Sequence, residues 1–337
     1  MKILVIRLSS MGDVILTTPL FSFLKKQYPD KASITFITGS EYAGLFADDP
    51  RLSETAGLDA ASLEMPAHLL PSAWDMVVDC QNNSRSRALV KSVRTASLGF
   101  FDKLHWQRFM LLFLRCNRYD PTRHVAARYI QAADPASAGA AIEPPRLFFR
   151  EDARSRMRLM VRGRSGGNEK PLLALLPFSA WKNKEWPSAY YVNVGRHFLA
   201  KGWDVAIVGG PSDAKRAGQM KGLIGGGCIS LAGDLSLYEC GCLFSGCTSL
   251  ALGNDTGLSH LARACGVKTG ILYGPTTSHF GFYPYGEPPF RVFEERLLCR
   301  PCHAHGGNVC LRFSRRCLRQ IGPAGVICGL EELLNKI

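Results

Sequence analysis

A short polar segment in the second half of the chain could bind a phosphate. Asp255, Thr256 and Gly257 follow the apolar run 248–252, and His260 comes one turn later. The pattern predicts a buried strand, a tight turn and the start of a helix. The first amides of such a helix lack intrahelical partners and its dipole favours negative charge, so a phosphate is a natural ligand there. Simple helix capping, with His260 as an ordinary partly buried histidine, explains the same residues equally well.

Two lysines follow a second expected strand, residues 172–178. Lys184 or Lys182 could reach a diphosphate held at the Asp255 turn, and Ser179 opens the same loop. A positioned lysine and helix-end amides can neutralise the charge on a departing nucleoside diphosphate without a metal. Lysines in a polar loop are, however, usually solvated.

A third polar turn follows the expected strand 204–209. Gly209 and Gly210 lead into Asp213 at the start of a helix. The position suits a contact with a nucleoside or a sugar, although these residue types are also ordinary turn and cap formers.

An acidic residue follows the first expected strand, residues 2–8. Asp13 comes directly after Gly12, and its carboxylate could accept the proton of a hydroxyl nucleophile within hydrogen-bond reach. The alternative is that Asp13 only caps the helix that begins at Val14. The glycine spacing of a dinucleotide fingerprint is missing, which argues against NAD.

Alternating strands and helices position these residues. Buried strands are expected at 2–8, 33–38 and 75–80 in the first half and at 172–178, 204–209, 228–231, 248–252 and 268–273 in the second. The alternation predicts an α/β fold with two Rossmann-like doubly wound domains, in which ligands bind beyond the carboxyl ends of the strands. Asp13 and Gln81 both fall at such ends. We expect a cleft between the two domains.

The glycine-rich segment 162–170 is the best linker in the sequence. We therefore expect an N-terminal domain at 1–165, a second domain at 166–320, and a C-terminal helix at 321–337 that packs across the domains. The strand-like residues 146–149 and a helix at 151–161 precede the linker.

A net charge of +13 over 337 residues calls for an anionic partner. The chain has no nucleic-acid-binding signature, so an anionic membrane face or an acidic substrate is the better explanation. Apolar runs are too short to span a bilayer, and the N-terminus does not have the pattern of a secretory signal.

Basic residues gather between 85 and 128 with aromatic and aliphatic residues between them: Arg85, Arg87, Lys91, Arg94, Lys103, Arg108, Arg115, Arg118, Arg123 and Arg128. Such a segment suits a membrane surface, although a helix with one core face and one solvated basic face is the commoner situation.

Twelve cysteines are spread without the pattern of a secreted disulfide framework, which favours a reducing cytosol. Four of them, Cys299, Cys302, Cys310 and Cys317, have the elements of a four-thiolate zinc site, though not its usual spacing. Reduced thiols or a labile disulfide are the alternatives.

The motifs taken together resemble glycosyltransferase family 9, the bacterial lipopolysaccharide heptosyltransferases and their relatives. The resemblance spans both halves of the chain in the correct order and rests on five segments: Ile6-Arg7-Leu8 with Gly12-Asp13 and Thr17-Thr18-Pro19, Lys184 with Trp186-Pro187, Val208-Gly209-Gly210, Asp255-Thr256-Gly257 with His260, and Tyr273-Gly274-Pro275-Thr276.

The resemblance implies a GT-B architecture and an inverting transfer of heptose from ADP-L-glycero-D-manno-heptose to the inner core of lipopolysaccharide. Asp13 would be the general base and Lys184 would contact the phosphates, so both are candidate catalytic residues. The donor would also contact Ser179, Lys182, Gly209, Gly210, Asp213, Asp255, Thr256, Gly257 and His260. The acceptor would contact Gly12, Thr17, Gln81, Arg85 and Arg87. The chemistry requires neither a metal nor another cofactor.

We expect a monomer on the cytoplasmic face of the inner membrane, where the acceptor is an anionic glycolipid. Two other functions stay open. One is another nucleotide-sugar enzyme on the same scaffold, with a different donor sugar or acting as an epimerase or hydrolase. The other is a nonenzymatic protein that binds an anionic glycolipid.

Overall fold

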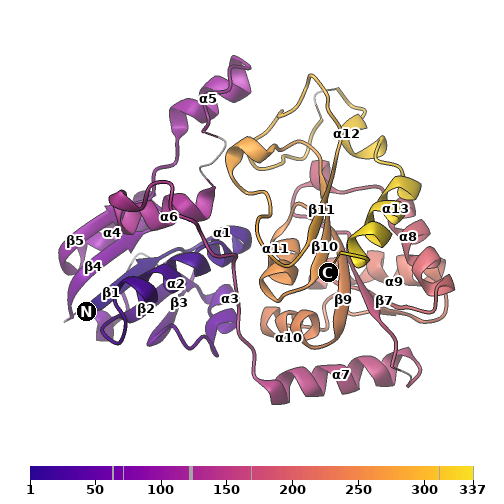
Figure 1. Ribbon diagram of the computed structural model, residues 1–337, viewed down its shortest axis with the longest axis horizontal. Coiled ribbons are helices and arrows are strands. Elements are labelled where there is room, and N and C mark those ends of the chain that lie inside the picture. The colour runs from indigo at the N-terminus through magenta and orange to yellow at the C-terminus, as the bar shows by residue number, and fades with distance from the viewer. Residues whose placement is uncertain (63, 71, 121–123, 168, 311, 337) are drawn as a thin grey trace. The chain divides into compact units, whose positions relative to one another are not determined.

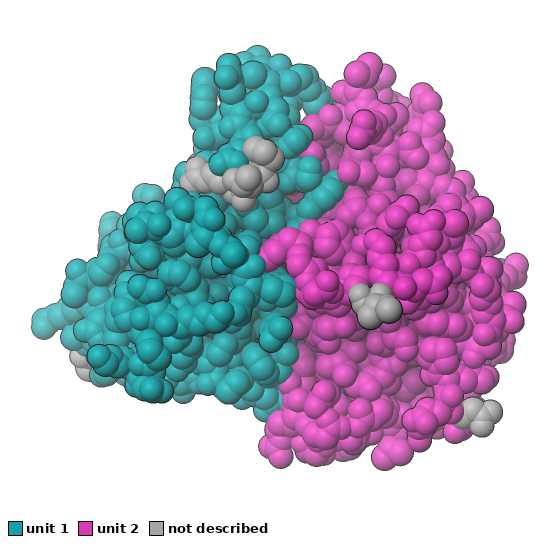
Figure 2. All heavy atoms as spheres, in the orientation of Figure 1, with its two compact units in different colours: residues 1–148, 278–283 teal, residues 149–277, 284–337 magenta. Residues whose placement is uncertain are grey.

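Two parallel β-sheets organise the chain. The computed structural model describes residues 1–337 except 63, 71, 121–123, 168, 311 and 337. It divides into unit 1, residues 1–148 with 278–283, and unit 2, residues 149–277 with 284–337, which Figure 2 colours separately.

The sheet of unit 1 has the strand order β3-β2-β1-β4-β5, and all of its pairings are parallel. β1, with the sequence KILVI, is buried on both faces because helices cover the sheet (Figure 1). The strands are β1 (Lys2–Ile6), β2 (Ser33–Gly39), β3 (Glu54–Leu58), β4 (Ala73–Asp79) and β5 (Arg94–Phe100). The helices are α1 (Met11–Ile15), α2 (Thr18–Gln27), α3 (Ser40–Ala43), α4 (Ser84–Lys91), α5 (His105–Phe113) and α6 (Val125–Ala133).

The sheet of unit 2 has the order β11-β10-β9-β6-β7-β8, again parallel. The strands are β6 (Leu172–Leu176), β7 (Asp204–Ile207), β8 (Cys228–Ser230), β9 (Thr248–Asn254), β10 (Lys268–Tyr273) and β11 (Phe290–Glu294). The helices are α7 (Glu151–Ser165), α8 (Ser188–Ala200), α9 (Ala214–Ile224), α10 (Leu237–Cys247), α11 (Gly257–Ala264), α12 (Arg316–Arg319) and α13 (Pro323–Leu334).

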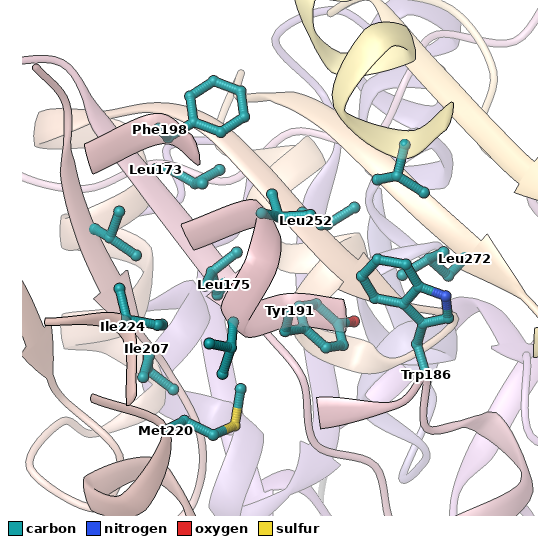
Figure 3. Packing of buried hydrophobic residues seen from close by; sticks show 14 of the residues in the cluster. Leu173, Leu175, Trp186, Tyr191, Phe198, Ile207, Met220, Ile224, Leu252 and Leu272 are labelled. Carbon is teal, nitrogen blue, oxygen red and sulfur yellow. The ribbon is translucent and has the colours of Figure 1, made fainter. Parts of the chain in front are cut away.

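The core of unit 2 fixes the segment that follows β6. Leu173 and Leu175 of β6 pack beneath α8, and Trp186 lies against Tyr191 with ring centroids 5.0 Å apart (Figure 3). The indole N–H of Trp186 donates to the carbonyl of Ile321 at 2.9 Å. Residues 179–185, here called the lysine loop, precede Trp186 and are therefore anchored to the core at their C-terminal end.

The division between the units differs from the expected boundary near residue 165. α7 belongs to unit 2, where it packs on α10 and where Arg158 donates to the carbonyl of Gly246 at 3.2 Å. α7 also continues through the first part of the expected linker and ends at Gly166, whose φ of 104° is left-handed. Asn168, in the same linker, lies outside the described residues.

Three further expectations need revision. Residues 146–149 form no strand, because their backbone pairs with neither sheet. α13 packs on α8, β10 and β11, all within unit 2. Residues 278–283 belong to unit 1, where the amide of Val125 donates to the carbonyl of Gly281 at 3.0 Å and the buried ring of Phe280 packs against Tyr119. The aromatic character of this stretch is explained by that packing.

Strands β3, β5 and β11 were not expected from the sequence. β5 lies within the basic segment 85–128, and most of its residues are exposed, so it has no buried apolar run that would predict it. Arg123 of that segment lies outside the described residues. Within the described ranges, no helix is long and apolar enough to cross a membrane.

Candidate active site

The expected site residues gather where the strand order reverses in each sheet. In unit 1 the reversal lies between β1 and β4, which are followed by Asp13 and Gln81 respectively. In unit 2 it lies between β6 and β9, which are followed by Lys184 and Asp255. Such switch points are the preferred ligand sites of doubly wound sheets.

Asp13 is held by three neighbours in unit 1. Its Oδ1 lies 2.8 Å from Arg7 Nη2 and accepts a hydrogen bond from the hydroxyl of Tyr129 at 3.1 Å. Its Oδ2 accepts from the Ser10 hydroxyl at 2.8 Å and, more weakly, from the Ser10 amide at 3.4 Å. Asp13 thus sits in the first turn of α1 and bonds back to the N-cap residue Ser10, which accounts for part of the capping role.

Burial alone would raise the pKa of Asp13, but the charge of Arg7 and the hydrogen bonds from Ser10 and Tyr129 outweigh it, so the pKa lies below its ordinary value. Burial likewise opposes the charge on Arg7, whose pKa is nevertheless raised by Asp13. The carboxylate is therefore ionised and fixed in orientation at neutral pH. It can accept a proton only from a group placed directly against it.

Among the other residues expected to bind an acceptor, Thr17 and Gln81 bond to the protein backbone. Thr17 is fully buried and donates to the carbonyl of Asp13 at 3.0 Å, so its hydroxyl supports the backbone instead of facing a ligand. Gln81 accepts from the amides of Leu8 and Ser9 at 3.1 and 3.2 Å, which fixes the turn after β1. Gly12 is part of α1, next to Asp13.

Two arginines of α4 differ in exposure. Arg85 is half-buried and donates to the carbonyls of Asp59 and Ser62, so it holds that loop. Arg87 is exposed and lies over the ring of Phe100. Of the two, Arg87 is the better placed to meet a ligand from solvent.

Lys184 and Asp255 form a buried ion pair in unit 2. Lys184 Nζ lies 2.6 Å from Asp255 Oδ2, and their side chains are 12% and 8% exposed. The ammonium also donates to the Asp255 carbonyl at 3.1 Å, and the Thr276 hydroxyl donates to Asp255 Oδ2 at 2.9 Å. Burial would raise the pKa of Asp255, but Lys184, with smaller contributions from His260 and Thr276, lowers it overall. Lys184 is thus the lysine that meets the Asp255 turn, whereas Lys182 is exposed.

The start of α11 leaves polar groups for a ligand. Thr256 is the N-cap residue, yet its hydroxyl makes no capping bond and is buried without a partner in the described structure. Gly257 is the first residue of the helix, and His260 lies close enough to influence Asp255. The free hydroxyl, the helix-start amides and the adjacent ammonium together suit an oxyanion such as a phosphate.

The turn after β7 is tied to the lysine loop. A Cβ on Gly209 would lie 2.5 Å from the Phe178 ring, so only glycine fits there. Asp213 Oδ2 accepts from the Gly210 amide at 3.1 Å. Glu185 accepts from the Ser179 amide at 3.2 Å and from both terminal nitrogens of Arg216 at 3.0 and 2.7 Å. The backbones of Ser179 and Gly210 are therefore both held in place by carboxylates.

Residues 299–317, here called the cysteine tail, hold the lysine loop from the other side. The amide of Asn183 donates to the carbonyl of Gly307 at 3.2 Å, and the amide of Lys182 donates to Asn308 at 3.3 Å. Arg315 donates to the carbonyl of Lys182 at 3.1 Å. The tail thus fixes the backbone around Lys184.

The expected zinc site is not formed by the residues described, which leave out 311 within the tail. No three His, Cys, Asp or Glu side chains among them are placed to hold a metal ion. Burial would raise the pKa of Cys310, but backbone N–H groups of residues 312–315 lower it overall. Burial, with the nearby Cys302, raises the pKa of Cys317 to about 11.

Four functional neighbours were not predicted as site residues. Arg7 follows a buried strand, and a charged residue at that position is a usable signal. Tyr129 reaches Asp13 from a distant part of the chain, and nothing in the local sequence marks it. Glu185 is next to Lys184, and Thr276 stands in one of the segments that carry the resemblance, so both could have been selected from their neighbours.

Comparison with known proteins identifies the fold and family. A family model described as glycosyltransferase family 9 (heptosyltransferase) matches residues 64–305, well over half of the chain. The chain belongs to glycosyltransferase family 9. The family and the enzyme class, a glycosyltransferase, are therefore as the sequence predicted. Asp13 precedes the matched residues, so its role has to be argued from geometry.

Relatives of this glycosyltransferase match it from end to end. Lipooligosaccharide heptosyltransferase 2 of Haemophilus influenzae is 26% identical, with 100% of each chain covered. The glycosyltransferase family 9 structure from Veillonella parvula has a TM-score of 0.80 at 22% identity, covering 99% of this chain and 97% of that one. E. coli ADP-heptose lps heptosyltransferase II has a TM-score of 0.76 at 22% identity, covering 99% and 98%. The two-sheet GT-B type of fold is confirmed.

Proposed function

We propose that this glycosyltransferase moves a heptose from ADP-L-glycero-D-manno-heptose to the inner core of a lipopolysaccharide precursor, with inversion at the anomeric carbon. The family match and the names of its relatives, which are lipopolysaccharide and lipooligosaccharide heptosyltransferases, support the donor and the acceptor class. The observation that carries the proposal is the oxyanion site at the β6/β9 switch point. It combines Lys184, Thr256 and the start of α11.

In the proposed reaction the acceptor hydroxyl oxygen attacks the anomeric carbon of the heptose. The bond from that carbon to the β-phosphate oxygen breaks, and ADP leaves from the opposite face, so the configuration inverts. Asp13 accepts the hydroxyl proton through Oδ2, which is bonded to the neutral hydroxyl and amide of Ser10, whereas Oδ1 is held by the charge of Arg7 and by the Tyr129 hydroxyl. No metal is required, because Lys184 and the α11 amides stabilise the charge that develops on ADP.

The residues of unit 2 that are proposed to bind the donor fall into groups, according to the part of the donor that each contacts. Lys184, Thr256 and Gly257 face the diphosphate, with Asp255 and His260 holding the turn. Gly209, Gly210 and Asp213 are proposed to contact the nucleoside or sugar, and Ser179 and Lys182 the phosphates from the loop. Gly12, Gln81, Arg85 and Arg87 are proposed on the acceptor side, whereas Thr17 acts only through the backbone of Asp13.

We propose further that the enzyme works as a monomer at the cytoplasmic face of the inner membrane. Its net charge of +13 supports attraction to anionic lipid and to an acidic acceptor.

The decisive experiment incubates the protein with ADP-heptose and a heptose-deficient lipopolysaccharide core, and measures product mass. We expect the addition of a single heptose. Release of ADP at the same rate without acceptor would instead identify a hydrolase, and an absence of any turnover with this donor would refute the donor assignment.

A further inference from the structure

Helix α5 carries a row of exposed aromatic rings. Trp106, Phe109 and Phe113 are spaced three and four residues apart, so they share one face of the helix. Their rings form a continuous row: Trp106 stacks on Phe109 with centroids 5.9 Å apart, and Phe109 lies tilted against Phe113 with centroids 5.1 Å apart. They are 65%, 45% and 72% exposed, and the next residue, Leu114, is 59% exposed. Only Leu111 of this helix is buried.

This arrangement is the reverse of an ordinary surface helix. A helix that serves a folded core buries its apolar face and exposes its polar one. α5 stands away from the sheet of unit 1 (Figure 1) and exposes the rings instead. Contact between water and so much apolar surface is unfavourable, so we expect an apolar partner or medium to cover the rings.

The charges around the rings select that medium. Residues 103–118 contain Lys103, Arg108, Arg115 and Arg118 and no acidic residue. Arg115 and Arg118 are exposed, just beyond the end of the helix. Aromatic rings flanked by cationic side chains match the interface of an anionic bilayer, where the rings enter the acyl boundary and the cations meet phosphate groups.

The segment that leads into α5 lies within electrostatic range of the proposed general base. β5 ends at Phe100 on the carboxyl edge of the sheet, and Lys103 follows within electrostatic range of Asp13. Three of the residues between β5 and α5 are fixed. Phe101 and Leu104 are buried, and the carbonyl of Asp102 accepts a hydrogen bond from Arg128 at 3.0 Å. α5 is therefore joined to the Asp13 site through an anchored segment.

We propose that α5 lies in the interface of an anionic membrane, inserting Trp106, Phe109 and Phe113. This docking holds the carboxyl edge of unit 1, with Asp13, next to the surface from which a lipid-anchored acceptor projects. The second statement rests on the proposed function. The first does not, since membrane insertion is measured without sugar transfer.

The test uses vesicles of phosphatidylethanolamine with phosphatidylglycerol, and vesicles of phosphatidylcholine alone. The full chain is sedimented with each, and brominated lipids are used to quench tryptophan emission. We compare the wild type with a triple variant, Trp106→Ser with Phe109→Ser and Phe113→Ser, and with the single variant Phe113→Ser. The control is Leu159→Ser with Leu223→Ser, which removes two leucines that are 67% and 56% exposed on α7 and α9.

We expect the wild type and the control to bind the anionic vesicles equally. The triple variant should bind about a hundredfold more weakly and Phe113→Ser about tenfold more weakly, because each ring removed takes apolar area out of the interface. Arg118→Gln should weaken binding about fivefold. Quenching by brominated lipid should disappear in Trp106→Phe.

Unchanged vesicle binding by the triple variant would overturn the proposal, as would wild-type binding without any quenching. Circular dichroism and ADP affinity confirm that the variants are folded. Transfer to a deacylated, water-soluble acceptor should be unaffected by the triple variant, whereas transfer to acceptor in vesicles should fall. If neither acceptor is used but quenching depends on Trp106, the proposed function fails while the docking proposal stands.

Discussion

Replacing Lys184 by methionine tests the donor half of the site most directly. Methionine keeps the unbranched stem and removes only the ammonium, which in the wild type lies 2.6 Å from Asp255 and donates to its carbonyl. The change therefore has two consequences. It removes a cation from the phosphate site, and it leaves a buried carboxylate without its main partner.

The magnitudes follow from burial. Both side chains of the pair are nearly inaccessible, so breaking it should lower the free energy of unfolding by about 3–5 kcal/mol. Loss of a charge-assisted contact to the diphosphate should cost about 1.5–3 kcal/mol of binding, or roughly a tenfold to hundredfold weaker ADP affinity. Lys182→Met is the matched control for stability. Its side chain is exposed on the same loop, so its stability should stay within about 0.5 kcal/mol of the wild type.

The pH dependence of stability provides a sharper signature. The pKa of Asp255 is depressed in the folded wild type, so its contribution to stability is present above the unfolded value of about 4 and is lost as the pH falls below it. In Lys184→Met the largest lowering influence is gone and burial should raise the pKa. Stability should then increase as the pH falls from neutral toward about 4, which is opposite in sign to the wild-type trend.

Urea unfolding between pH 4 and pH 7, roughly the range in which a buried carboxyl titrates, and calorimetric titration with ADP measure both effects. The double variant Lys184→Met with Asp255→Asn should recover much of the lost stability without recovering ADP affinity. Lys184→Met with wild-type stability and wild-type ADP affinity would refute the reasoning. An ADP defect seen in Lys182→Met alone would transfer the phosphate role to Lys182.

Three further outcomes are expected. Asp13→Asn should lower transfer at least about a hundredfold while ADP affinity stays unchanged, and retained turnover would remove Asp13 as the base. Tyr129→Phe removes a hydrogen bond that lowers the pKa of Asp13, so the acidic limb of the pH profile of kcat/KM should move to higher pH. Tyr119→Phe is the control. An unchanged acidic limb in Tyr129→Phe would contradict an effect of Tyr129 on the pKa of Asp13. Cys310, whose pKa is lowered, should be alkylated by iodoacetamide faster than Cys240, whose pKa burial raises to about 12. Mass spectrometry of peptides checks both, and equal labelling would argue against the difference.

Sequence periodicity was most informative where both faces of a strand are buried. β6 is a continuous apolar run and β1 is one after Lys2, and their positions were predicted to within two residues. β5 could not be predicted in the same way, because most of its side chains are exposed. The boundary between the units was also misplaced, since the glycine-rich segment after α7 suggests a linker whereas the packing of α7 on α10 decides the division.

The site shows the same limit. Residues at strand ends, such as Asp13, Lys184 and Asp255, could be selected because a parallel sheet brings those ends to one edge. Which of them contact one another depended on partners far away in sequence. Tyr129 reaches Asp13 across 116 positions and Lys184 reaches Asp255 across 71. The burial of Thr17 could likewise not be predicted from the local sequence.

The hydrogen bonds between the cysteine tail and the lysine loop affect the order in which the chain can fold during synthesis. Residues 181–184 leave the ribosome more than a hundred residues before Gly307, Asn308 and Arg315, whose contacts fix them. The sheet of unit 1 lacks this dependence, because β1 to β5 are all complete by Phe100. During translation the strands of unit 1 can therefore pair while the loop around Lys184 is still unsupported. The proposed nucleotide site is therefore completed only after Arg315 has been synthesised.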